Sequence, residues 1–403
     1  MTPPDFLPQW PPAANSLVLF ALLLLAGALG GRLAATTRVL PAITGYIAIG
    51  FLLGPGGLHV LNAGALADAR LFADVSLGVV VFELGRRLDL QWARHDRWLL
   101  PMGLAESLLS FAGMFLLLRL LSFPALEAGV IATFGIATAP AVVLLVTREL
   151  RADGPVTRRA LWHVALNNIV AILGLAFLLP FIEAQASGAT WSPVARSLWV
   201  VGGSFLLGYA AFRLMTFVAS IVGKGTAPQF ILTVATIILT VGVAQSLKLS
   251  VLLALLVLGI CAHNLDRHHR LIDVRLGDAG ELFFVVLFVL TGATLRVEHF
   301  GNAAWIGLAF VAARFAGKGV ALLALCRPAR VTVPQAGALA LTLMPIGGLA
   351  LGMTQPIFDV APEFGARLAA IVASGIALLH ILGPIATRYA LLRVGEGEAG
   401  ARN

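Results

Sequence analysis

Long apolar segments alternate with short polar connections along the whole chain. Most of these segments are about twenty residues long, the length an α-helix needs to cross the roughly 30 Å hydrocarbon core of a bilayer. The pattern predicts an all-α integral membrane protein with about thirteen transmembrane helices. The predicted spans cover residues 16–34, 39–58, 70–88, 98–120, 124–146, 158–182, 197–219, 228–246, 249–265, 279–297, 302–325, 332–353 and 366–390.

Composition and charge agree with a membrane protein. Hydrophobic residues make up 59% of the 403 positions and charged residues only 12%, whereas a soluble domain is about half apolar and about a quarter charged. The net charge of +8 does not indicate a nucleic-acid partner, because the Lys and Arg residues lie between the apolar segments, as in short membrane loops. Cys261 and Cys326 form no pair or Cys/His pattern, so neither disulfides nor a zinc site nor any cofactor is expected.

The basic residues also predict the orientation in the bilayer. If the spans alternate and the N-terminus lies outside, most of the 28 Lys and Arg residues face one side, which is then the cytoplasm. Those that face the other side are Arg70, Arg119, Arg196, Lys248, Arg296 and Arg367. We expect a multi-pass protein of the cell inner (plasma) membrane with the C-terminus in the cytoplasm. Residues 1–15 contain no Lys or Arg and are not expected to be a signal peptide, and no soluble domain is expected.

Two predicted spans carry a proline in their interior. Span 124–146 contains Thr138 and Pro140, and span 332–353 contains Pro345, in each case with Gly or Thr nearby. Each helix could unwind there and free backbone amides and carbonyls, which is tolerated in a membrane only inside protein or beside a water-filled cavity. The two spans are seven apart and run in opposite directions, as in inverted repeats of six helices joined by a linking helix. The alternative is a simple proline kink in each helix.

Five stretches carry a resemblance to a known group of proteins. They are Gly45–Gly57 (GYIAIGFLLGPGG), Thr138–Pro140 (TAP), Glu281–Gly292, Pro345–Gly348 and His380–Pro384. Together they resemble the monovalent cation:proton antiporter families, most closely the second, which includes sodium/proton antiporters and glutathione-gated potassium efflux systems. The resemblance implies exchange of a monovalent cation such as Na⁺ or K⁺ for H⁺, and a homodimer.

The same resemblance implies a division of the membrane domain. A core built from residues 98–182 and 302–390 would hold the two crossed broken helices and move against a scaffold built from residues 16–88 and 197–297. Small inorganic ions, protons and the lipid bilayer would be the partners. An enzyme is not expected, because no paired carboxylates, metal cluster or nucleophile motif occurs in a plausible cavity.

The sequence departs from the family pattern in span 158–182. The family usually carries Asn-Asp, Asp-Asp or Gln-Asp at mid-helix, and the second residue takes the proton or the cation. Here the two positions are Asn167 and Asn168. An asparagine offers a carbonyl oxygen to a cation but exchanges no proton near neutral pH, so the usual coupling acid is missing.

Ionisable residues inside the other spans are functional candidates because each is costly in a membrane. Arg314 and Lys318 are four residues apart in span 302–325 and share one helix face. In one interpretation, both residues only balance the charge at the ends of the broken helices. In the other, one of them titrates or holds an anion and so takes part in transport. Glu106, His380 and Glu83 are possible proton carriers. Glu106 could also pair with Arg314 or Lys318, and Glu83 with a neighbouring arginine.

These observations leave three functions open. The first is cation:proton antiport, the second is a carrier of an anion or polar solute that uses Arg314 and Lys318, and the third is a non-transporting sensor with an antiporter fold. The predicted ion- or substrate-binding residues are Asn167, Asn168, Lys318, Arg314, Thr138, Pro140 and Pro345.

Overall fold

The computed structural model describes an assembly of α-helices. It describes residues 16–36, 42–61, 70–86, 88–187, 192–223, 225–266, 277–293, 304–347 and 360–397, together with 271, 350, 353, 354 and 357. The helices are α1 (Ser16–Thr36), α2 (Ala42–Leu53), α4 (Arg70–Arg86), α5 (Leu90–His95), α6 (Leu99–Leu120), α7 (Ala125–Ile136), α8 (Pro140–Glu149), α9 (Pro155–Ser187), α10 (Pro193–Val222), α11 (Thr226–Ser246), α12 (Val251–Asn264), α13 (Gly277–Ala293), α14 (Ala304–Leu325), α15 (Val333–Thr342) and α17 (Pro362–Arg393).

Each of the thirteen predicted spans overlaps a described helix or helix pair. Parts of the predicted spans 39–58, 70–88, 279–297, 302–325 and 332–353 lie outside the described residues. Within the described ranges, 6 helical segments are long and apolar enough to cross a membrane, judged by length and composition, and shorter apolar helices such as Ala42–Leu53 accompany them. The most buried segment is Ala125–Glu149, which combines α7 and α8 and contains an apolar stretch of 18 residues that is 100% buried inside the protein. A segment this apolar that touches almost no surface is surrounded by other helices, as the central helix of a membrane domain would be.

Two helices are interrupted where the prolines predicted it. Helix α7 ends at Ile136 and α8 begins at Pro140, with an extended backbone between them. Helix α15 ends at Thr342, and residues 344–347 are not helical. The two breaks meet, because the Ala139 amide donates a hydrogen bond of 2.9 Å to the Pro345 carbonyl. The prediction of two crossed discontinuous helices is therefore confirmed.

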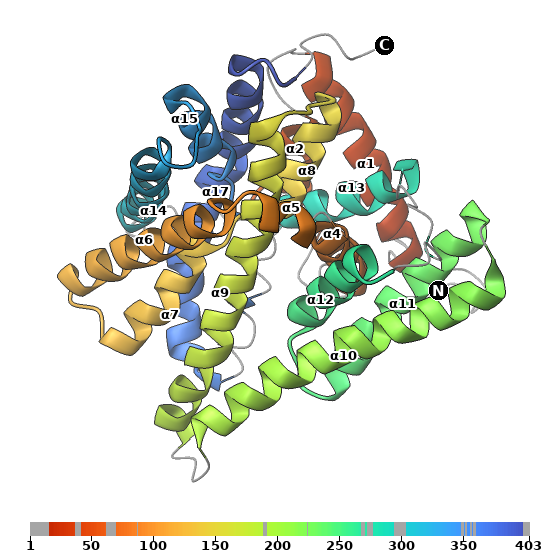
Figure 1. Ribbon diagram of the computed structural model, residues 1–403, viewed down its shortest axis with the longest axis horizontal. Helices are drawn as coiled ribbons and strands as arrows, with labels where there is room; N and C mark the ends of the chain where they lie inside the picture. The colour runs from red at the N-terminus through yellow and green to blue at the C-terminus, as the bar shows by residue number, and fades with distance from the viewer. Residues whose placement is uncertain are drawn as a thin grey trace, which may run out of the picture.

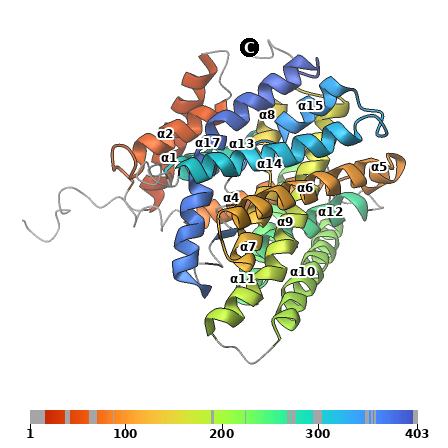
Figure 2. The ribbon, with the colours of Figure 1, turned by 90° about the vertical axis from the view of Figure 1, so that its left-hand side faces the viewer.

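The helices pack in two groups. In one group α6 lies against α14, α7 lies against α6 and α9, and α17 lies against α14 and α15. In the other, α2 lies against α1 and α13, and α12 lies against α4 and α10. Figure 1 shows α10 as a long helix along one edge of the molecule, and Figure 2 shows α14 and α6 side by side. Helix α9 touches both groups, since it also packs against α10.

Glycines set the closest helix crossings in the second group. A Cβ added to Gly45 of α2 would lie 2.0 Å from the Gly30 carbonyl oxygen of α1, and one added to Gly292 of α13 would lie 2.1 Å from the Ile47 carbonyl oxygen. Only glycine permits backbones to approach this closely. The Gly45–Gly57 signature thus has a packing role, because its first glycine lets α1 and α2 meet.

The structure adds one element that hydropathy did not predict. Helix α5 is a short connector between α4 and α6, and Asp89 caps it by accepting hydrogen bonds from the Gln91 and Trp92 amides. The predicted span 158–182 is also extended at both ends, as α9. The cap of α5 is a polar side chain at a helix start, which a search for apolar segments does not weigh.

Candidate ion and proton site at the crossing of the broken helices

Arg314 of α14 binds the C-terminal ends of both interrupted helices. Its guanidinium donates to the Ala137 carbonyl at 2.7 Å, at the end of α7, and to the Leu343 and Met344 carbonyls at 3.0 and 2.6 Å, at the end of α15. The side chain is 1% exposed. The C-terminus of a helix carries about half a negative charge, so the two ends together offset the single positive charge of this arginine.

Lys318, one turn further along α14, pairs with a carboxylate on a different helix. Its Nζ lies 2.8 Å from Oε2 of Glu106 on α6, and both side chains are 0% exposed. The ammonium also donates to the Ile136 carbonyl at 3.1 Å. Both buried cations of α14 therefore have compensating negative charge from the protein itself, one from helix ends and one from Glu106.

The two asparagines of α9 hold the unwound segment between α7 and α8. Asn168 Nδ2 donates to the Thr138 carbonyl and to the Val164 carbonyl, each at 2.8 Å. Asn167 Nδ2 donates to Thr138 Oγ1 at 3.2 Å, and its Oδ1 accepts from Ser107 Oγ at 2.8 Å. An ionised aspartate could not donate these bonds. The amide at Asn168 is thus a structural donor at the position where the resemblance predicts an acid.

The side-chain oxygen of Asn168 takes no part in these hydrogen bonds. Its Oδ1 is buried and has no hydrogen-bond partner among the described residues, and the same is true of Oε1 of Glu106. A buried polar atom that stays unpaired costs free energy and calls for an explanation. Both atoms are oxygens without a proton of their own, which is the kind of group that coordinates hard cations.

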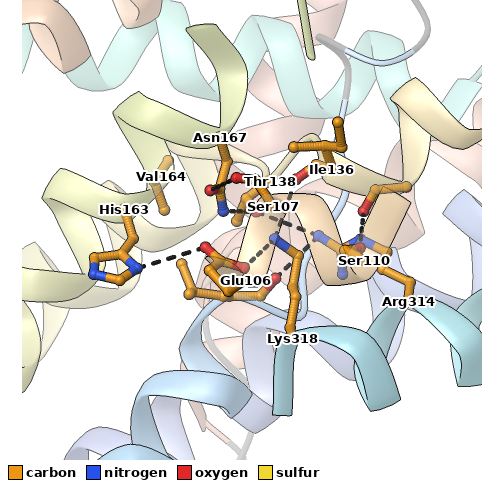
Figure 3. A network of polar contacts seen from close by, with 12 residues as sticks. Glu106, Ser107, Ser110, Ile136, Thr138, His163, Val164, Asn167, Arg314 and Lys318 are labelled. Atoms are coloured by element: carbon orange, nitrogen blue, oxygen red, sulfur yellow. Dashed lines mark hydrogen bonds and ion pairs between the residues drawn. The ribbon is translucent and has the colours of Figure 1, made fainter. Parts of the chain in front are cut away.

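His163 completes the cluster, and it was not among the predicted site residues. Its Nδ1 lies 3.5 Å from Oε1 of Glu106, and the side chain is 0% exposed. Figure 3 shows the Glu106 carboxylate between His163 and Lys318. The signal that could have identified it was its spacing: His163 precedes Asn167 by four residues and so lies on the same face of α9.

A close helix contact brings Lys318 to Glu106. A Cβ added to Gly317 would lie 2.6 Å from the Leu109 carbonyl oxygen of α6. The absence of a side chain at Gly317 therefore lets α14 touch the backbone of α6, and the next residue reaches across to the carboxylate. Gly319, two residues on, has nothing within 4 Å of such a Cβ, so the requirement is specific to the contact face.

The remaining candidates are Glu83, His380, Pro140 and Pro345, and only the two prolines are described at the crossing. Glu83 of α4 pairs with Arg148 of α8, where these two helices touch. His380 lies in α17, and its side chain is outside the described part of the protein. Pro140 is the first residue of α8, and Pro345 contributes the carbonyl that accepts from Ala139. Among the described residues, no group of three or more His, Cys, Asp or Glu side chains could hold a metal ion.

Comparison with known proteins gives matches of three kinds. The family model described as sodium/hydrogen exchanger, transmembrane, matches residues 18–387. Among curated proteins, K(+) efflux antiporter 1 and K(+) efflux antiporter 2, both chloroplastic and from Arabidopsis thaliana, are 26% and 25% identical over 187 residues. That alignment covers 45% of this chain and 15% of each relative, so the match spans only a small part of the length of those proteins.

Two solved structures share the fold over nearly the whole chain. Both are of the sodium proton antiporter MjNhaP1 from Methanocaldococcus jannaschii. The first, at pH 8, gives a TM-score of 0.70 at 17% identity and covers 94% of this chain and 95% of that one. The second, an electron-microscopy structure, gives 0.73 at 14% identity and covers 94% and 96%. At this level of identity the likeness concerns the arrangement of helices.

Proposed function

The chain belongs to the transmembrane sodium/hydrogen exchanger family, and from this premise we propose that it is a secondary transporter that exchanges a monovalent cation such as Na⁺ or K⁺ for H⁺. One observation carries the proposal for this particular chain. A fully buried carboxylate, Glu106, is paired with Lys318 beside the crossing of two broken helices. Exchange at one site requires a group that holds either a proton or a cation, and Glu106 is such a group.

In this proposal the coupling acid has moved from α9 to α6. Asn168 occupies the position of the usual acid and donates to two backbone carbonyls. Glu106 approaches the same region from the neighbouring helix. Its Oε1 and the Oδ1 of Asn168, both without hydrogen-bond partners among the described residues, are the oxygens we assign to the transported cation. The cation must therefore compete with Lys318 for the charge of this carboxylate. When a proton neutralises the carboxylate, the cation leaves.

The charge distribution favours a cation over an anion as the substrate. An anion carrier would need a positive charge that the protein itself does not offset. Arg314 is bonded to three carbonyls at two helix ends, and Lys318 is bonded to Glu106 and to the Ile136 carbonyl. Both cations of α14 are thereby compensated. Neither is left to attract an anionic solute.

The finer features of the proposal concern movement, assembly and orientation. We propose that the core, residues 98–182 and 302–390, moves against the scaffold, residues 16–88 and 197–297. The Glu83–Arg148 pair is then a contact that this movement must break.

A homodimer in the inner (plasma) membrane, with the N-terminus outside, completes the proposal. Reporter fusions at Gly64 and Gly395 test the orientation, and fusions that report the same side would contradict it.

The activity itself is testable with purified protein in liposomes. A pH gradient is imposed, a pH-sensitive dye is trapped inside, and Na⁺, K⁺, Li⁺ or choline is added outside. We expect rapid dequenching with at least one alkali cation and none with choline, and no change when gluconate replaces chloride. Cation-independent proton flux, or none at all, would reject antiport. Uptake that depends on the anion would instead support the solute-carrier alternative.

A further inference from the structure

His163 is a buried titratable residue with no role in the cation and proton exchange proposed for Glu106. Its side chain is 0% exposed, and neither ring nitrogen has a hydrogen-bond partner among the described residues. A histidine that only filled space would be expected to bond through at least one nitrogen. Its nearest charged group is Oε1 of Glu106, 3.5 Å from Nδ1.

Each oxygen of the Glu106 carboxylate faces a different basic side chain, Lys318 or His163. Oε2 is bonded to Lys318 at 2.8 Å, while Oε1 has only His163 close by. Several other carboxylates near α9 pair with arginines, in the pairs Asp96–Arg159, Asp153–Arg158, Glu83–Arg148, Glu149–Arg388, Glu127–Arg367 and Glu183–Arg196. In the described part of the chain, Glu106 is the carboxylate that lies beside this imidazole.

The depth of these residues in their helices indicates where His163 stands on a proton path. Glu106 follows the start of α6 by seven residues, and His163 follows the start of α9 by eight, so both lie about 10–12 Å from the same end of the bundle. One turn nearer that end, Arg159 contacts Met102 Sδ at 3.7 Å and Asp96 at 2.5 Å. Asp96 and Arg159 are partly exposed, at 19% and 13%.

We propose that His163 is the proton relay of the transport site, an inference that rests on the proposed function. A proton from the side of the Asp96–Arg159 pair binds Nε2, and the proton on Nδ1 passes to Oε1 of Glu106. The imidazole is left neutral, and the carboxylate becomes a neutral acid. The reverse transfer restores the carboxylate when the cation returns. Oε1 then holds the proton in one half of the cycle and the cation in the other.

Histidine suits this role because its two nitrogens can accept and release a proton on opposite sides of one ring, and it changes charge near neutral pH. A glutamine at position 163 could still donate a hydrogen bond to Oε1 of Glu106, but it could not carry a proton. A relay and a purely structural histidine therefore predict different results for the same variant.

The experiment compares His163→Gln with His263→Gln in liposomes. His263 is an exposed histidine in the last turn of α12, so the control removes an imidazole that has no part in the proposed proton path. For His163→Gln we expect cation-driven proton flux to fall by about 100-fold, the lower end of what a positioned acid–base group contributes. The remaining flux should have a different pH dependence from the wild type, because a glutamine at this position carries no proton. His263→Gln should match the wild type.

A second measurement does not depend on flux. Addition of the transported cation to purified wild-type protein in weak buffer should release protons, and the pH dependence of that release should change in His163→Gln. A flux–pH profile and a proton release that superimpose on the wild type would overturn the relay while leaving antiport intact. Absence of cation-driven flux in the wild type would reject the proposed function and the relay with it. If both His163→Gln and His163→Asn fail to fold, His163 is a structural residue and the proposal is wrong.

Discussion

Replacing Lys318 with methionine removes a buried charge while keeping an unbranched side chain of similar length. The ammonium bonds to Glu106 and to the Ile136 carbonyl, and both partners lie where no solvent reaches the side chains. After the substitution the carboxylate is buried without a counter-charge, and the carbonyl at the end of α7 loses a donor. Breaking one side of a buried ion pair costs about 3–5 kcal/mol.

This cost sets the expected change in melting temperature. With an average unfolding entropy per residue, a chain of 403 residues loses about 1.2 °C for each kcal/mol, so Lys318→Met should melt about 4–6 °C below the wild type. The double variant Glu106→Leu/Lys318→Met removes both charges. Exchanging a buried pair for apolar side chains is commonly neutral or stabilising, so the double variant should recover most of the loss.

The assay is thermal unfolding in detergent, with Lys248→Met as the control. Lys248 is an exposed lysine in the connection between α11 and α12, and its loss should leave the melting temperature unchanged. If Lys318→Met melts with the wild type, or if the double variant is less stable than either single variant, the pair does not hold the site together and the reasoning fails.

Three further predictions concern the same region. Gly317→Ala should lower the melting temperature and transport, because its Cβ would lie 2.6 Å from the Leu109 carbonyl oxygen, whereas Gly319→Ala has open space and should be neutral or slightly stabilising; equal melting of both variants would refute the close-contact argument. Asn168→Asp places a carboxylate against two carbonyls, so its melting deficit should grow as pH rises and the acid ionises; a deficit independent of pH would contradict this. Arg314→Gln should destabilise the protein in a way that Arg314→Lys only partly restores, because one ammonium cannot reach both helix ends as a planar guanidinium does; full rescue by lysine in a melting curve would show that charge alone suffices.

Much of the architecture could be predicted from the sequence because membrane helices must be long and apolar. The interrupted helices were also predictable, since Pro140 and Pro345 remove backbone donors inside otherwise regular spans. These are local signals: they depend on residues next to each other in the chain, and no knowledge of packing is needed.

The composition of the site was harder to predict, because it depends on which helices touch. Lys318 had several possible partners from its sequence alone, and it bonds to Glu106 because Gly317 brings α14 against α6. Glu83 was expected beside a neighbouring arginine, and its pairing with Arg148 could not be predicted, because that residue lies on a helix that is distant in the sequence. His163 was missed because one histidine in an apolar helix carries no pattern until the carboxylate opposite it is known.

In the proposed mechanism, Glu106 of α6 is the acid that couples proton movement to cation movement. The direct test is cation-driven proton flux in liposomes for Glu106→Gln beside Glu127→Gln, a change to a carboxylate on α7 that pairs with Arg367 away from the crossing. We predict that Glu106→Gln shows no cation-dependent proton flux at any pH, while Glu127→Gln transports like the wild type. Wild-type proton-coupled flux in Glu106→Gln would contradict the account, because the site would then exchange protons without the carboxylate on which the account depends.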